Sequence, residues 1–422
     1  MSSKISKKVI STLPKFMKLP IIRSTLKLPM DTPEGLEFRF VSSKEEFLKA
    51  SRLLHDCYVE FGYMKEDPQG LRLTPYHLLP TTLNVIALWE GEVIGTLLII
   101  RDNVSGLPMD KTYDLSPLRK NGKVLAEISG LAIHPKYRAS KGALFHYFIR
   151  YFWRYAKEWH GLDYFVIAVN PAMSDFYEAF YMFKPMNLNH VINGYEFANG
   201  APAVALKIPV ETSFDIFKST YKNKPDVNNL YTFMTKSQLS TEIYPFKEYY
   251  TLSDNYLNQF TFRDIYKSVP DFNSRFSENI KNDFSRIYGF KNFEDLVDKQ
   301  KTARLRHEIR TLGLISDEKS RHEGVKLAPV FDISKNGLKL KANEVLDKNN
   351  YSLTVTLGPN KKSNLIAEPV WNTSTGETGL KIISHDDEWE KMNNSIELKI
   401  KATLPKPIES NLETSLPFKK AG

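Results

Sequence analysis

The sequence has a single cysteine and no long apolar run. Cys57 is alone among 422 residues, which excludes an intramolecular disulfide framework and a cysteine-rich metal site and favours a reducing compartment. The best candidate for a membrane span, VIALWEGEVIGTLLII, carries two glutamates and falls short of the ~20 apolar residues that a spanning helix needs. The N-terminus lacks the apolar centre and small-residue cleavage site of a signal peptide. We therefore expect a cytoplasmic protein.

Acidic residues are missing from the first 30 positions. Every charged residue there is basic: Lys4, Lys7, Lys8, Lys15, Lys18, Arg23 and Lys27. Because they alternate with apolar residues, residues 1–30 could contact the inner face of a membrane, each basic residue adding about 1 kcal/mol. Packing of this arm on its own protein is the open alternative. Nucleic acid is not an expected partner, because the rest of the chain has little excess charge and no recognised nucleic-acid-binding motif.

The length and composition indicate several globular domains. With 422 residues, 42% hydrophobic and 25% charged, the chain suits two or three. After the basic arm (1–35), residues 36–212 alternate strand-like and helix-like runs, which predicts a mixed αβ domain. Residues 213–300 are polar and aromatic and predict a helical connector. Short β-rich runs over 301–395 predict a small all-β barrel, and the proline-containing residues 396–422 are expected to form a tail.

The run VLAEISGLAI carries the first candidate catalytic group. With a period of two, Leu125, Glu127, Ser129, Leu131 and Ile133 share one strand face, unless a bulge resets the alternation. Burial among apolar side chains raises the pKa of a carboxyl group toward neutrality, which suits a general base that must take a proton from an amine. An ion pair between this glutamate and a neighbouring Lys or Arg is the structural alternative.

The runs SGLPMDKTY, LAEISGLAIHPKYR, VNPAMSDFYEAF and NGAPAVALKI occur in the order found in GNAT-type N-acyl amino acid synthases. Residues 36–212 resemble this family, and AEISGLAI resembles the Glu-x-Ser-Arg strand of the related N-acylhomoserine lactone synthases. The resemblance implies that Glu127 is the base. Gly130 replaces the arginine, so a homoserine lactone product is not expected. The resemblance also implies that Tyr177 protonates the leaving thiolate; aromatic packing is its alternative role.

The run from Arg138 to Ala143 resembles the loop with which GNAT proteins hold a pantetheine donor. Unpaired backbone amides at a helix start, together with the helix dipole, bind phosphate. Lys141 stands where a glycine is expected, which favours one phosphate over a pyrophosphate and thus acyl carrier protein over coenzyme A. The resemblance implies an acyl-donor site of Leu131, Ile133, Arg138, Lys141, Gly142 and Ala143, with an amide near Leu131 for the oxyanion. It needs no metal.

A second resemblance lies in the predicted barrel. PilZ domains that bind cyclic di-GMP carry Arg-x-x-x-Arg followed by Asp/Asn-x-Ser-x-x-Gly, and this sequence has both: Arg306, Arg310, Asp332, Ser334 and Gly337. Two guanidinium groups one turn apart can bind phosphates and guanine edges. The alternatives are a solvated helix end for the arginines and a type I′ turn at Asn336-Gly337, which is compatible with ligand binding.

These patterns together predict an α/β domain of the GNAT fold, a helical connector and an all-β PilZ-like barrel. The predicted function is transfer of a fatty acyl group from acyl-ACP or acyl-CoA to an amino acid or related amine, regulated by cyclic di-GMP. The alternative is a cyclic di-GMP receptor or adaptor whose GNAT-like module binds a partner or an acyl group without catalysis. Gly130 and Lys141 favour this alternative, because both differ from the residues found in the related enzymes. Cys57 could act as a covalent nucleophile only if a neighbouring base took the proton of its thiol.

Overall fold

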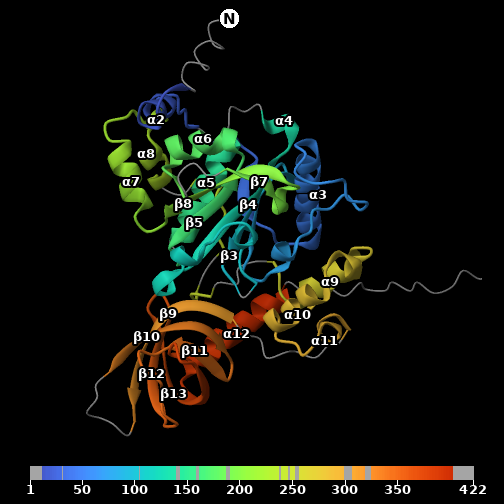
Figure 1. Cartoon of the computed structure of the whole chain (residues 1–422). Coiled ribbons are helices and arrows are strands. Elements are labelled where there is room, and N and C mark those ends of the chain that lie inside the picture. Colours follow the sequence, from blue (N-terminus) through green and yellow to red (C-terminus); the bar gives the residue numbers. More distant parts are fainter. Residues whose placement is uncertain are drawn as a thin grey trace, which may run out of the picture.

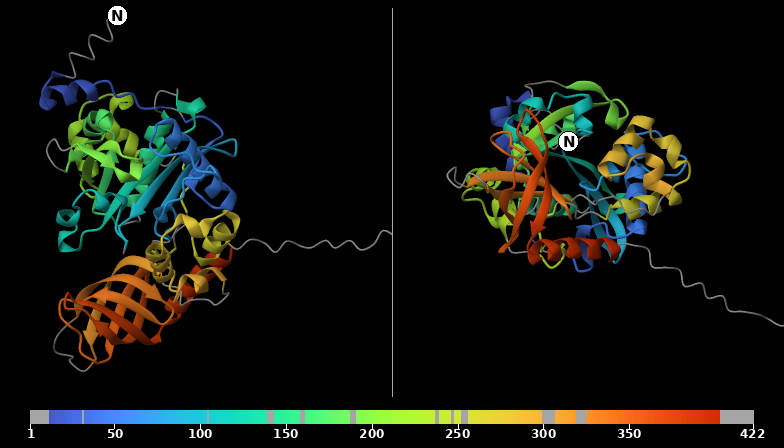
Figure 2. Two further views of the ribbon diagram at one scale, coloured as in Figure 1. Left: turned by 45° about the vertical axis from the view of Figure 1, so that its right-hand side comes forward. Right: turned by 90° about the horizontal axis from the view of Figure 1, so that it is seen from below.

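The computed structural model describes residues 12–30, 32–103, 105–138, 143–157, 161–186, 191–236, 239–245, 248–251, 256–298, 307–318 and 325–402. Figure 1 shows an αβ domain with a β-barrel at the end opposite the N-terminal helix, and Figure 2 shows the same arrangement from two further sides. The predicted mixed αβ front and C-terminal barrel are confirmed.

The front domain is built on one eight-stranded sheet in the order β1-β2-β3-β4-β5-β8-β6, with β7 paired to β8. Its strands are β1 (Leu36–Phe40), β2 (Leu83–Trp89), β3 (Glu92–Arg101), β4 (Leu125–Ile133), β5 (Tyr164–Val169), β6 (Lys184–Pro185), β7 (Ile192–Tyr195) and β8 (Ala201–Pro209). The principal helices of this domain are α3 (Lys44–Glu60), α5 (Ala143–Tyr155) and α6 (Pro171–Tyr181). The short α4 (Pro135–Arg138) follows β4.

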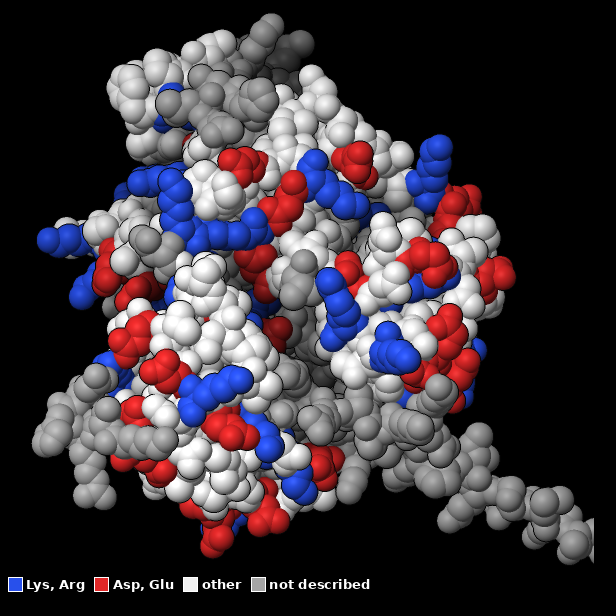
Figure 3. All heavy atoms as spheres, turned by 60° about the horizontal axis from the view of Figure 1, so that its bottom comes forward, with Lys and Arg blue, Asp and Glu red and all other residues white. Residues whose placement is uncertain are grey.

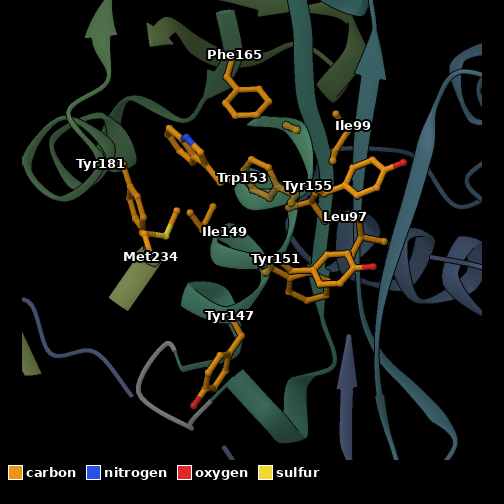
Figure 4. Close-up of a cluster of buried hydrophobic side chains, with 14 of the residues drawn as sticks. Leu97, Ile99, Tyr147, Ile149, Tyr151, Trp153, Tyr155, Phe165, Tyr181 and Met234 are labelled. Atoms are coloured by element: carbon orange, nitrogen blue, oxygen red, sulfur yellow. The ribbon is translucent and has the colours of Figure 1, made fainter. Parts of the chain in front are cut away.

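Helix α5 packs on one face of the sheet through aromatic side chains. Trp153 is fully buried and meets Phe165 of β5 edge to face, with ring centroids 5.1 Å apart. Figure 4 shows this cluster, with residues of α5 directed toward Leu97 and Ile99 of β3. The aromatic residues of α5 recur at helical spacing, which places them together on the face that packs on the sheet.

The segment predicted as a connector covers both faces of the front domain. Helices α7 (Ser213–Thr220) and α8 (Leu230–Thr235) lie near α5, where Arg150 forms a buried ion pair with Glu242, 2.7 Å between Nε and Oε1. Helices α9 (Gln259–Ser268), α10 (Glu278–Ile287) and α11 (Phe293–Asp298) share a hydrophobic core with the opposite face. Their attachment includes a 2.7 Å hydrogen bond from the Tyr288 hydroxyl to the Leu78 carbonyl.

Six antiparallel strands close the C-terminal barrel in the order β10-β11-β14-β13-β12-β9. They are β9 (His307–Asp317), β10 (Lys326–Ser334), β11 (Gly337–Lys341), β12 (Tyr351–Gly358), β13 (Lys361–Asn372) and β14 (Glu377–His385). A helix that the sequence did not predict, α12 (Asp387–Ala402), follows them and buries Trp389 and Met392 against the barrel. It runs through residue 396, where the tail was expected to begin; residues 403–422 lie outside the described part.

The described part of the basic arm packs on its own protein. Helix α2 (Lys15–Arg23) lies against α6, where Lys15 and Lys18 pair with Glu178 and Asp175. Phe16 of the same helix is 77% exposed, and a membrane contact by residues 1–30 stays a prediction, with residues 1–11 outside the described part. None of the described helices is both long and apolar enough to cross a membrane. Figure 3 shows basic and acidic side chains interspersed over one face of the molecule.

Candidate functional site

Strands β4 and β5 separate at Glu127. They pair in parallel at Leu125↔Tyr164, Ala126↔Phe165 and Glu127↔Val166, and pairing ends there although β4 continues to Ile133 and β5 to Val169. The sheet therefore opens into a wedge immediately beyond Glu127. Backbone groups that leave a ladder are free to contact a bound molecule.

A bulge in β4 lies on one side of this wedge. Thr96 pairs with Ala132 and Leu98 with Ser129, so Gly130 and Leu131 together face a single residue of β3. Gly130 has φ +60°, and a Cβ there would lie 2.7 Å from Leu98 Cδ1. The bulge resets the alternation, so Leu131 and Ile133 pack toward the α5 side of the sheet instead of sharing the face of Glu127. The positive φ and the close contact with Leu98 favour glycine over arginine at position 130.

The Glu127 carboxyl group is buried and held at both oxygens. It is 1% exposed, Oε2 accepts a 2.8 Å hydrogen bond from the Met109 amide, and Oε1 accepts a 3.4 Å hydrogen bond from the Tyr195 hydroxyl. Burial raises the pKa of Glu127 to about 8, the two hydrogen bonds oppose the rise, and nearby Asp110 adds to it. No ion pair with Glu127 occurs among the described residues. Its environment is that of a group that ionises near neutral pH.

Sequence reasoning missed the two groups that hold Glu127. Met109 lies in a 3-10 helix, η2 (Pro108–Lys111), and Tyr195 at the end of β7. Met109 falls within SGLPMDKTY, a run that carried the resemblance but had no assigned role. Tyr195 is 68 residues from Glu127, and no local pattern in the sequence marks it.

Tyr177 lies on α6, beyond the end of β5. Burial raises the pKa of its hydroxyl well above the ordinary value, and nearby Tyr58 adds to the rise. The ring also packs on Phe145 and Phe183, with centroids 6.0 and 5.9 Å away. A phenol that stays protonated can act as an acid, so the position suits both roles given for Tyr177 in the sequence analysis.

The predicted donor loop is described only at its two ends. Arg138 is bound to Glu60 of α3 through two 2.7 Å hydrogen bonds, and its Nε donates to the Ile133 carbonyl at 2.8 Å. Ala143 begins α5, whereas Lys141 and Gly142 lie outside the described residues. Cys57 is buried beside Arg138, and burial raises the pKa of its thiol, which opposes a nucleophilic role.

Arg72 is a buried cation near Glu127 that the sequence did not single out. It is 7% exposed, and its guanidinium carbon lies 4.3 Å from the ring centre of Tyr58 and 4.9 Å from that of Phe197. Nη2 donates to the Phe197 carbonyl at 2.7 Å. No ion pair with Arg72 occurs in the described part of the chain, and its Nε is buried without a hydrogen-bond partner.

A pocket of about 390 Å³ lies next to these aromatic residues, between the front domain and the connector. Its front-domain wall includes Leu73, Tyr76 and Phe197, and its connector wall includes Phe276 and Ile280. Tyr76 is close enough to Glu127 for the carboxylate to contribute to raising the pKa of Tyr76 to about 12. The volume falls within the range of small-molecule sites.

The described part of the second predicted site lies on β10 and at the start of β11. Asp332 and Ser334 are partly exposed on β10, beside the buried Ile333. Arg310 lies within β9, with its side chain outside the described part, and Arg306 is not described. Arg310 has an extended backbone in β9, and the arrangement of the two arginine side chains stays a prediction.

The type I′ turn that was the alternative role of Asn336-Gly337 does not form. Ser334 pairs with Gly337, so Lys335 and Asn336 form the turn, and neither they nor Gly337 has the positive φ that a type I′ turn requires. A Cβ at Gly337 would lie 2.8 Å from the Leu380 carbonyl oxygen. Close packing against β14 therefore requires glycine here, apart from any ligand.

The two candidate sites are joined by an ion pair. Arg101, at the end of β3, binds Glu308 of β9, with 2.6 Å between Nη1 and Oε2. Glu308 pairs across the strands with Asp332, and Arg101 pairs with Ala126, next to Glu127. Arg101 thus contacts the residue that pairs with Asp332 and itself pairs with the strand of the candidate base.

A family model for the N-acyl amino acid synthase FeeM matches residues 49–209. The match includes Arg72, Glu127, Gly130 and Tyr177 and ends before the barrel. No curated protein matches the chain.

Solved structures match the same part of the chain. FeeM, an N-acyl amino acid synthase from uncultured soil microbes, is 26% identical, with 44% of this chain and 95% of that chain covered and a TM-score of 0.37. The CoA-dependent acyl-homoserine lactone synthase BjaI is 16% identical, with 44% and 88% covered and a TM-score of 0.34. The AHL synthase LasI is 15% identical, with 42% and 88% covered and a TM-score of 0.31. Over residues 49–209 the chain is similar to N-acyl amino acid synthases.

Proposed function

We propose that the front domain transfers a fatty acyl group from an acyl thioester to the amine of an amino acid or a related amine. The observation that carries the proposal is the buried Glu127 carboxyl group at the point where β4 and β5 separate, with a pKa of about 8. A base for an amine must ionise near the working pH and yet be basic enough to accept the proton. The family match over residues 49–209 supports the same reaction.

In the proposed mechanism the amine nitrogen attacks the thioester carbonyl carbon. Glu127 takes the amine proton through a water molecule, because the carboxylate is only 1% exposed. The amide of Leu131, in the bulge of β4, stabilises the oxyanion of the tetrahedral intermediate. Collapse of the intermediate breaks the carbon–sulfur bond, and Tyr177 protonates the leaving thiolate. The products are an N-acyl amine and a free thiol.

The donor is proposed to be acyl-ACP in preference to acyl-CoA, with its phosphate at the start of α5 near Lys141, Gly142 and Ala143. Arg138 is bound to Glu60, so its proposed role is to position this loop. Gly130 lies in the bulge with φ +60°, where glycine is favoured for backbone reasons, so its presence does not by itself support a non-catalytic adaptor.

Expression of the intact chain in a bacterial host tests the reaction. Lipid extracts analysed by mass spectrometry are expected to contain new N-acyl amines with the wild type and none with Glu127→Gln. Glu34→Gln, which makes the same chemical change at an exposed site, is expected to match the wild type. Unchanged lipids with the wild type would refute the proposed function.

The proposal extends to cyclic di-GMP as the ligand of the barrel. The motif of Arg306, Arg310, Asp332, Ser334 and Gly337 supports it, because guanidinium groups suit phosphates and guanine edges and a carboxylate accepts from guanine N–H groups. Calorimetry with cyclic di-GMP is expected to show binding to the wild type, retained in Lys362→Ala and lost in Arg310→Ala. No heat with the wild type would refute this ligand.

Regulation is proposed to pass through the Arg101–Glu308 ion pair. A nucleotide beside Asp332 would change the surroundings of Glu308 and thereby the support of β3 and β4. Glu308→Gln is expected to keep cyclic di-GMP binding while abolishing its effect on turnover. The same effect on turnover in Glu308→Gln as in the wild type would exclude this route.

A further inference from the structure

A buried arginine normally has an acidic partner, and Arg72 has none among the described residues. Removing a guanidinium group from water is unfavourable unless its charge and donors are matched. Here two aromatic faces and two acceptors, the Phe197 carbonyl oxygen and the Met64 sulfur, surround the group, and Nε donates to nothing. The Nε donor and the positive charge are therefore left without a partner among the described residues.

The backbone holds Arg72 rigidly in this position. Its amide donates to the Ser51 carbonyl of α3 at 3.2 Å, and the Ser51 hydroxyl donates to the Arg72 carbonyl at 3.0 Å. The segment before it is fixed by Asp67, which pairs with Arg275 of the connector at 3.0 Å. A preorganised cation of this kind gives up little freedom when it binds a ligand.

The neighbours of Arg72 connect it to the catalytic strand. The Tyr58 ring lies over the guanidinium, and burial raises the pKa of its hydroxyl, which is also affected by nearby Gly130, three residues beyond Glu127. Tyr195, which donates to Glu127 at 3.4 Å, is also close enough to Arg72 to affect its charge equilibrium. Tyr58 and Tyr195 thus each lie close to both Arg72 and Glu127.

We propose that Arg72 binds the carboxylate of the acyl acceptor and holds the acceptor with its amine toward Glu127. The acceptor is therefore an amino acid with a free carboxylate, and its side chain extends along Phe197 into the 390 Å³ pocket. This inference rests on the proposed function and names the substrate class.

Charge and geometry favour a carboxylate over a phosphate. Arg72 is the cation whose guanidinium lies over the rings of Tyr58 and Phe197. Lys111 and Arg275 line the adjoining pocket, and Arg275 is paired with Asp67. Burial lowers the pKa of nearby His77 to about 3, so this side chain is neutral. One positive charge balances a monoanion, whereas a phosphate monoester carries about −1.5 to −2 at pH 7. A guanidinium edge also matches the two oxygens of a carboxylate.

The test compares acceptors with and without the carboxylate, using the purified full chain and decanoyl thioester donors. Wild type is expected to acylate L-phenylalanine roughly 10- to 100-fold more efficiently than L-phenylalaninamide, the range for a charged hydrogen-bonded contact. Arg72→Gln is expected to remove this preference by raising the KM for phenylalanine, with the KM for the donor unchanged. Equal use of the two acceptors by wild type, or an unchanged preference in Arg72→Gln, would overturn the inference.

A binding measurement separates failure of the inference from failure of the proposed function. Calorimetry is expected to show that N-decanoylphenylalanine binds the wild type and Arg72→Lys more tightly than its methyl ester does, with the difference absent in Arg72→Gln. This readout does not require turnover, so a wild type without activity that still shows it would refute the reaction alone. A different outcome would overturn the inference and assign the site to the phosphate of the donor. In that outcome inorganic phosphate binds only when Arg72 is present, and N-decanoylphenylalanine and its methyl ester bind equally.

Discussion

Replacing Glu127 with glutamine is expected to have opposite effects on activity and on stability at alkaline pH. The glutamine side chain keeps an oxygen for the Met109 amide but cannot take a proton. Loss of a general base lowers kcat by roughly 100- to 10,000-fold, with the KM for the donor unchanged. In wild type, a pKa of about 8 leaves roughly a tenth of the carboxyl groups ionised at pH 7 and about nine tenths at pH 9. The rate is therefore expected to rise about tenfold between these pH values.

The same pKa determines how stability depends on pH. The folded-state pKa of about 8 lies above the ordinary value of 4.5, so the fold favours the protonated form. The stabilisation is complete below pH 4.5 and is lost as the pH rises toward 8, at about 1.4 kcal/mol per unit. Between pH 5 and 8 the free energy of unfolding of wild type should thus fall ~3 to 5 kcal/mol further than that of Glu127→Gln.

Two assays check this prediction. Steady-state rates from pH 6 to 9.5 give the kinetic pKa, and urea unfolding at pH 5 and 8 gives the difference in stability. Glu34→Gln, at an exposed position, is the matched control and is expected to behave like wild type in both. A flat pH–rate profile, or equal pH dependence of unfolding in wild type and Glu127→Gln, would refute the reasoning from burial.

Three other variants test separate parts of the structure. Gly130→Ala is expected to lower the free energy of unfolding by ~1 to 3 kcal/mol more than Gly70→Ala does. Both glycines have a positive φ, but only at Gly130 would the added Cβ lie within 3 Å of a neighbouring atom. Equal losses of stability in urea unfolding would show that the bulge is not tightly packed. Ile280→Trp places a larger side chain in the pocket beside Phe197. It is expected to reduce kcat/KM for phenylalanine at least ~10-fold while kcat/KM for glycine stays unchanged. An equal reduction of kcat/KM for both acceptors would contradict an acceptor pocket. Trp389→Ala is expected to destabilise the barrel by ~3 to 5 kcal/mol, because this side chain is fully buried and donates a hydrogen bond to the Lys335 carbonyl. The measurement is calorimetric unfolding of the full chain. An unchanged barrel transition would show that α12 is dispensable.

Long periodic segments were predictable from the sequence, and non-local arrangements were not. The aromatic spacing of α5 and the turn-separated strands of the barrel are local patterns, and both elements formed. The bulge at Gly130 depends on how β4 pairs with β3, so a strict period of two misplaced Leu131 and Ile133. Helix α12 did leave a signal, because Trp389, Met392 and Ile396 recur at helical spacing, and the prolines that suggested a tail begin only after residue 402.

The candidate site shows the same division. Glu127 was recognisable through the resemblance of its strand to that of the related synthases, because the apolar strand alone left an ion pair with Lys or Arg open. Met109, Tyr195 and Arg72 come from separate elements and meet only in the folded chain. Their roles depend on burial and on partners, neither of which a single sequence displays. The nucleotide motif stays a prediction from its spacing.

Product analysis with the purified full-length protein tests the central claim most directly. The protein is mixed with decanoyl-ACP or decanoyl-CoA and the twenty amino acids, and products are identified by mass spectrometry for wild type, Glu127→Gln and Glu34→Gln. The account predicts N-decanoyl amino acids with wild type and Glu34→Gln, and at least a ~100-fold lower yield with Glu127→Gln. N-acyl product at the wild-type rate from Glu127→Gln, or none from wild type with either donor, would contradict it.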